Sequence, residues 1–124
     1  MNSALAHIKE VLKAAKLEVI WDDDDREQSP NSFEKKALVS LGDIQTTQEA
    51  THFSDSISAS IQIEQESPEK AFLKINAIRS DLSTRETAGV AGVIFDGVSV
   101  SENSYVENLK TYKMNFKILT ITKR

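Results

Sequence analysis

The chain has 124 residues, of which 40% are hydrophobic and 27% charged, and its 15 basic and 19 acidic side chains give a net charge of −4. This length predicts a single domain spanning residues 1–124, and the absence of cysteine excludes a disulfide scaffold, a zinc ribbon and a thiol nucleophile. No apolar run approaches the about 18 residues that span a membrane, and no secretion signal is visible, so we expect an intracellular globular protein that makes no membrane contact.

The charge is distributed unevenly along the chain. Residues 1–66 hold 6 basic and 13 acidic side chains, a net charge of −7, whereas residues 67–124 hold 9 basic and 6 acidic ones, a net charge of +3. A folded unit with one negative and one positive side can stack head to tail with copies or partners, although two solvated faces without a partner explain the same pattern. The overall acidity argues against sequence-specific binding to nucleic acid.

The first quarter of the chain predicts a helix, a short strand and a loop. The helix is expected over residues 3–17, with Ser3 as its N-cap. Its apolar side chains recur every three or four residues and form one stripe: Leu5, Ile8, Leu12 and Ala15. The change of period at residues 17–21 predicts a short strand. Residues 22–32 are polar and begin with the acidic run Asp22–Asp25, so they are expected to form an exposed loop.

The next part predicts two strands joined by a polar connection. A strand is expected over residues 36–46, and residues 45–51 are expected to connect it to the next. The stretch 52–64 alternates between apolar and polar side chains, which is typical of a strand with one buried and one solvated face. The side chains of its apolar face are Phe53, Ile57, Ala59, Ile61 and Ile63, with Asp55 as the exception. We interpret the serines that alternate with them as the solvent side of the strand and not as nucleophiles.

The second half predicts a helix followed by two strands. Ser67 as N-cap and Pro68 in the first turn predict a helix that continues to about residue 82. Its apolar stripe is expected to be Phe72, Ile75, Ile78 (or Arg79 through its aliphatic stem) and Leu82. A strand is expected over residues 90–100, and Asp96-Gly97 inside it favours a bulge over a hairpin turn. After a polar turn at 101–108, alternation from Tyr112 to Ile118 predicts the final strand.

The expected fold class is therefore α+β. The element order is α-β-β-β-α-β-β, and the short connections favour a mostly antiparallel sheet on which both helices pack through their apolar stripes.

A search for catalytic or cofactor-binding motifs finds none. The four glycines form no phosphate-binding loop, and a calcium loop starting at Asp22 would require glycine at Glu27 and glutamate at Phe33. His7 falls in a helix and His52 begins a strand, and neither is accompanied by a nucleophile motif. We therefore expect a protein that binds and does not catalyse, with no catalytic residue, metal or cofactor.

The order and spacing of these elements resemble a known family. The segments that carry the resemblance are the opening helix at 3–17, the strand at 36–43, a hairpin tip through Thr46 and Thr47, the alternating strand at 54–64, the helix at 67–82 and the closing strand at 114–122. Taken together they resemble the tail terminator, or tail completion, proteins of long-tailed bacteriophages over nearly the whole chain.

The resemblance implies a structural function. Members of that family form a ring, typically of six copies, at the head-proximal end of the virion tail, after assembly in the host cytoplasm. The ring stops polymerisation of the tail tube protein and presents a surface for head joining, so the implied partners are other copies, the tail tube protein and a head-completion protein. The family has no catalytic residues.

Two charged groups are candidates for the partner interface. Lys113 and Lys117 lie on the polar side of the final strand and, with Lys110, are expected to face an acidic neighbour, unless they are ordinary lysines that protect a sheet edge. The run Asp22, Asp23, Asp24 and Asp25 is a second candidate contact, with a solubility feature as its alternative.

Two other classes of function stay open at this point. The chain is also compatible with a small acidic binding or immunity-type protein that masks a basic partner with Asp22–Asp25. A small α+β enzyme working at a dimer cleft is the third class, but the sequence offers no convergent acid–base pair for it.

Overall fold

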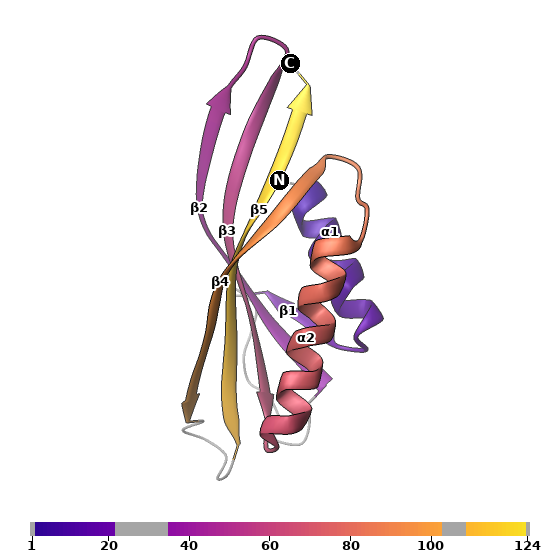
Figure 1. Cartoon of the computed structure of the whole chain (residues 1–124), viewed down its shortest axis with the longest axis vertical. Helices are drawn as coiled ribbons and strands as arrows, with labels where there is room; N and C mark the ends of the chain where they lie inside the picture. Colours follow the sequence, from indigo (N-terminus) through magenta and orange to yellow (C-terminus); the bar gives the residue numbers. More distant parts are fainter. Residues whose placement is uncertain (1, 22–34, 103–108, 124) are drawn as a thin grey trace.

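Both helices lie on the same side of a single twisted sheet (Figure 1). The computed structural model describes residues 2–21, 35–102 and 109–123, so the Asp22–Asp25 run lies outside the described residues. The elements are α1 (Asn2–Ala14), β1 (Glu18–Trp21), β2 (Lys36–Gln48), β3 (His52–Gln65), α2 (Pro68–Thr84), β4 (Val90–Glu102) and β5 (Lys110–Lys123). This order confirms the predicted α+β class and its α-β-β-β-α-β-β sequence of elements.

The five strands are arranged in the order β1-β2-β3-β5-β4. β1 pairs with β2 in parallel, from Glu18 opposite Lys36 to Trp21 opposite Val39, and the other three pairings are antiparallel. The prediction of a mostly antiparallel sheet is thus confirmed. The last strand, β5, lies between β3 and β4, so it is an internal strand of the sheet.

The core lies between the helices and one face of the sheet. Alternation along β3 and β5 turns matched apolar pairs toward the helices, such as Ile57 opposite Ile118 and Ala59 opposite Phe116. The helices contribute the other half of the buried cluster, including Ile8, Leu12, Ile75, Ile78 and Leu82. The period-2 pattern of residues 52–64 therefore predicts the buried face correctly.

The helix α1 differs from its prediction at both ends. It begins at Asn2, so Ser3 lies inside the first turn and the prediction of Ser3 as N-cap is wrong. It ends at Ala14, three residues before the predicted end, because Lys16 turns the chain with a φ of 61°. The amides of Lys16 and Leu17 donate to the carbonyls of Lys13 and Leu12, the pattern of a Schellman ending. Leu17 is thereby returned to the core.

The helix α2 begins as predicted. The Ser67 side chain accepts a hydrogen bond from the Lys70 amide, and Pro68 opens the first turn. The buried stripe is Ala71, Ile75, Ile78 and Leu82. Phe72 was predicted in that stripe, but it is 52% exposed and places its ring edge-on to Tyr112, with 6.1 Å between the centroids. The apolar stripe is therefore shifted by one residue at its start.

Register shifts interrupt β2 once and β4 twice, and the first shift in β4 lies between Val90 and Gly92. In β4 the register shifts between Phe95 and Gly97, which confirms the predicted bulge, and Gly97 adopts a φ of 122°. In β2 the register shifts between Leu41 and Ile44, so the predicted alternation ends there. The strands β2 and β3 also extend further than predicted, which shortens the connection between them to residues 49–51.

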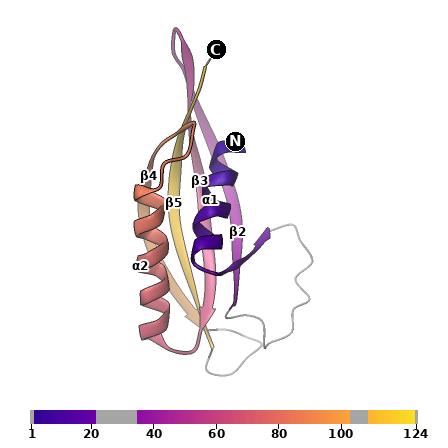
Figure 2. The ribbon, with the colours of Figure 1, turned by 90° about the vertical axis from the view of Figure 1, so that its right-hand side faces the viewer.

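The strands are longer than the helices that cover them. A strand of 14 residues such as β3 spans about 46 Å, whereas the 17 residues of α2 span about 25 Å. One end of the sheet therefore extends past both helices (Figures 1 and 2). None of the described helices is long and apolar enough to cross a membrane.

Candidate assembly surfaces

The sheet face without helices carries two of the three predicted lysines. Lys113 and Lys117 are exposed on β5 and alternate with buried Tyr112, Met114 and Phe116, so they point away from the core. Four residues along a strand place them about 13 Å apart. Lys110 has the same parity as the buried residues and is half-buried, so it does not share this face. The structure thus brings Lys113 and Lys117 together and separates Lys110 from them.

The position of β5 decides between the two interpretations of these lysines. A lysine protects an edge when it lies on an outer strand, where unpaired backbone groups are open to another chain. Lys113 lies opposite Gln62 on one side and Ser99 on the other, and Lys117 opposite Ser58 and Ile94. Both lysines are therefore in the interior of the sheet, and the edge-protection interpretation is wrong.

The outer strand at this side of the sheet, β4, carries exposed apolar side chains. From residue 90 to residue 101 its only charged side chain is Asp96. Val98 and Val100 are 39% and 52% exposed and lie opposite Met114 and Tyr112, on the helix side of the sheet. We call Val98, Val100, the half-exposed Phe72 and the outer backbone of β4 the β4 edge surface. Exposed apolar edges of this kind attract further strands.

The opposite side of the sheet has a second open strand. Within the described residues, β1 pairs with β2 only up to Val39. Beyond it, residues 41–56 of β2 and β3 form the hairpin that extends past the helices, which we call the arm (Figure 2). Leu41 and Ile44 on the arm are 37% and 42% exposed. The arm itself has three acidic side chains, Asp43, Glu49 and Asp55, and no lysine or arginine.

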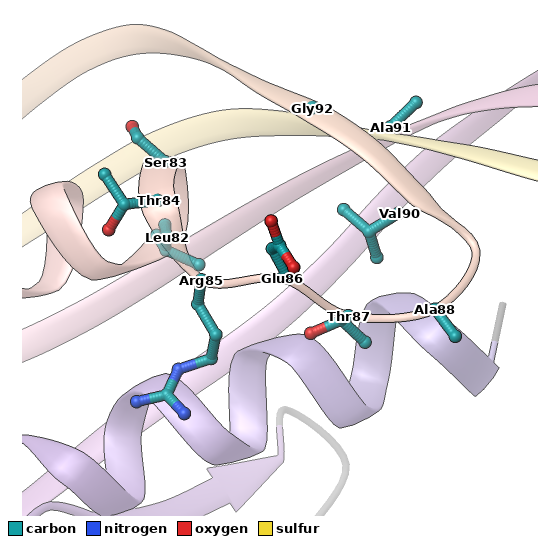
Figure 3. Close-up of a pocket in the computed structure, with 10 residues that line it drawn as sticks. All are labelled: Leu82, Ser83, Thr84, Arg85, Glu86, Thr87, Ala88, Val90, Ala91 and Gly92. Atoms are coloured by element: carbon teal, nitrogen blue, oxygen red, sulfur yellow. The ribbon is translucent and has the colours of Figure 1, made fainter.

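A hollow lies between the end of α2 and the start of β4 (Figure 3). It has a volume of about 660 Å³ and is lined mainly by residues 82–88. Arg85 points toward α1, whereas Glu86 points toward β4 (Figure 3). Arg85 donates hydrogen bonds of 3.0 and 2.9 Å to the Asp81 carboxylate, and these bonds raise the pKa of Arg85. In this hollow the charged groups are not brought together as an acid–base pair.

The side chain of His7 joins α1 to the end of α2 and to the loop that follows α2. Its side chain is fully buried, with Nε2 2.8 Å from the Leu82 carbonyl oxygen and Nδ1 2.7 Å from the Thr87 hydroxyl. Nε2 donates to the Leu82 carbonyl, because a carbonyl oxygen can only accept. His7 therefore connects α1 to the end of α2 and to the following loop. Among residues 2–21, 35–102 and 109–123, no group of three His, Asp or Glu side chains is placed to hold a metal ion.

Comparison with known proteins gives a likeness in fold but not in sequence family. A scan against protein-family models finds no match, and neither does a search of curated proteins. Among solved structures, the chain is similar to a chain of the "Virion of native gene transfer agent (GTA) particle", with a TM-score of 0.60 and 13% sequence identity. The alignment covers 97% of this chain and 96% of that one. The two chains share a fold along nearly their whole lengths.

The β4 edge surface was not among the residues predicted for an interface. Its signal in the sequence is a valine-rich strand with a single charge, but this pattern is equally typical of a buried internal strand. Only the order of the strands in the sheet distinguishes the two cases.

Proposed function

We propose that this chain is a structural subunit of a bacteriophage-type particle and that it acts as a tail terminator. In this role several copies, typically six, form a ring at the head-proximal end of the tail, stop growth of the tail tube and present a surface for head joining. The observation that carries the proposal is the likeness to a chain of a gene transfer agent virion, which extends over 97% of this chain.

The surfaces of the molecule support an assembly role over a catalytic one. The β4 edge surface and the arm lie at opposite sides of the sheet, and they differ in sequence and charge. When two different surfaces of the same protein bind each other, the copies join head to tail. Such copies form a closed ring when the rotations between successive copies add up to a full turn. A ring limits its own size, as a terminator requires. The proposed function needs no cofactor and no chemical step.

Light scattering combined with gel filtration, followed by a tube-growth assay, tests this function. We expect the purified chain to form a closed oligomer, and to shorten the tubes that the tail tube protein of the same particle forms when both are mixed. A chain that stays monomeric and leaves tube length unchanged would contradict the terminator role. A tight one-to-one complex with a basic protein would favour the acidic binding protein instead, and turnover of a generic ester or phosphate ester would favour the enzyme.

A further inference from the structure

We propose that the β4 edge surface of one copy binds the arm of the next copy, so that the sheets of neighbouring copies join edge to edge. This inference rests on the proposed ring and names the two surfaces that build it. The occupant of the β4 edge is thus a second copy of this chain, and the contact is head to tail.

The C-terminal part of β4 is a regular strand that, among the described residues, pairs on one side only. After the bulge, Gly97 to Glu102 pair with β5 without a further register shift. Along this stretch Val98 and Val100 are exposed. Tyr112, which lies opposite Val100, is in edge-on contact with the ring of the exposed Phe72. Proteins protect open edges with lysine, proline or short strands, and the stretch 97–101 has none of these. A further strand that paired with this stretch would bury its exposed apolar side chains and pair its free backbone groups.

The arm supplies a strand that matches this edge. From Ile44 to Gln48, β2 pairs with β3 in regular register, and on its other side no described strand pairs with it. Leu41 and Ile44 are apolar and exposed on the arm. Adding a strand to a sheet requires backbone groups that can pair and side chains that can pack. The arm of a neighbouring copy would supply both, since its apolar side chains can pack against Val98 and Val100.

The directions of the strands are compatible with a ring. β2 is antiparallel to β3, β3 to β5 and β5 to β4, so β4 runs opposite to β2. Copies related by rotation about an axis near the strand direction keep that direction, and the arm of one copy then meets β4 of the next in antiparallel orientation. Strands in closed sheets are tilted and displaced along one another. This displacement brings the protruding arm to residues 97–102, the C-terminal part of β4.

Apolar side chains and backbone groups, and not charge, carry this contact. Asp55 on the arm has the same parity as the buried Ile57, so it lies on the helix side of the sheet. Lys113 and Lys117 lie on the opposite face of β5, and Lys113 is separated from the edge by Ser99 of β4. Leu41 and Ile44 pair with Ala59 and Ile57 and therefore share the helix side with Val98 and Val100. The acidic neighbour predicted for the lysines stays a prediction.

Cross-linking between unlike cysteine variants tests the contact directly, because the natural chain has no cysteine. Ile44→Cys and Val100→Cys are made as single variants and treated with a short bismaleimide. We expect a covalent dimer from the mixture of the two variants and none from either alone. The double variant should give a ladder that ends at the size of the ring. Ala77→Cys, on the exposed side of α2, replaces Val100→Cys in the control mixture and should give no product.

A second variant measures the contribution of the edge without cross-linking. Val100→Lys should raise the concentration at which half of the chain is assembled by at least tenfold, while its thermal unfolding as a monomer stays unchanged. The control is Ala77→Lys, which places the same charge on the exposed side of α2, outside the two surfaces proposed to meet.

Each other outcome overturns the inference in a recognisable way. Cross-linking of Val100→Cys with itself would mean a two-fold contact between β4 edges. Rings that form normally with Val100→Lys, without product from the mixed cysteine variants, would overturn the edge contact and leave the terminator role standing. A chain that stays monomeric at every concentration and does not cross-link would overturn both.

Discussion

Ile44 and Ile57 lie opposite each other on neighbouring strands, yet Ile44 is 42% exposed and Ile57 is fully buried. Ile57 belongs to the part of the sheet that the helices cover, which we call the body, and Ile44 belongs to the arm. The backbone ladder is the same in both parts. The arm is therefore shaped by backbone pairing alone, whereas the body is also stabilised by side chains that are buried within the chain.

The two parts also differ in their side-chain hydrogen bonds. In the body, buried His7 connects Leu82 and Thr87 to α1, over separations of 75 and 80 residues. On the arm, Thr46 donates to Asp55 over a separation of nine residues, at 2.6 Å, in an exposed position. Long-range buried contacts fix how elements pack, whereas the contact on the arm joins two strands that already pair. On its inner side the arm is held by β5, which pairs with β3 as far as His52 opposite Lys123, so the side of the arm that is available to a neighbour is the outer side of β2.

The largest expected effect comes from shortening the two opposed isoleucines. Ile57→Ala should lower the free energy of unfolding by about 2–5 kcal/mol, because it leaves a cavity in a packed core. Ile44→Ala removes the same atoms from a half-exposed position and should cost about 1 kcal/mol or less. Urea unfolding of both variants below the concentration of assembly measures the difference. Equal losses would mean that the arm is as well packed as the body.

A smaller effect is expected at His7. His7→Leu keeps a side chain of similar size but leaves the buried Leu82 carbonyl without its donor, which should cost about 1–3 kcal/mol. Thr87→Val removes the other hydrogen bond of His7 and should cost about 1 kcal/mol, because this contact is only partly buried. Urea unfolding gives these values, and hydrogen exchange should become faster in the loop 85–89 while the arm is unchanged. Faster exchange on the arm would show that the two parts are coupled.

The sequence predicts most of the body and the reasons are local. Alternation along residues 52–64 identifies the buried face because β3 has helices on only one side. The pair Ser67-Pro68 identifies the start of α2 because a hydroxyl acceptor and a ring without an amide both suit the first turn. Phe72 was misplaced because a period of 3.6 allows either Ala71 or Phe72 at the edge of the stripe, and only the position of α2 near the outer strand decides.

The candidate interface depends on information that a single sequence does not contain. Lys113 and Lys117 were predicted correctly on a solvated face, but whether β5 is an edge strand depends on β4 pairing beside it. The open edge of β4 follows from the same pairing. The extent of the arm follows from the lengths of strands and helices, and β2 and β3 were predicted shorter than they are. Non-local strand order is therefore what separates an internal valine-rich strand from a docking surface.

Effects of similar or smaller size are expected at the bulge of the arm and at the bulge next to Gly97 in β4. Gly97 has open space around it, so an added Cβ would meet no atom. However, residues other than glycine rarely adopt its backbone φ of 122°. Gly97→Ala should therefore cost about 1–2 kcal/mol. Gly42 has no positive φ, and an added Cβ would lie 3.4 Å from the Ser58 Cβ. Gly42→Ala should therefore be neutral or should stabilise by up to about 1 kcal/mol, because the unfolded chain loses freedom. Thermal unfolding of the two variants measures both. A destabilising Gly42→Ala would mean that the bulge of the arm needs a glycine, and that the arm is held in its shape by its own backbone geometry as well as by its ladder.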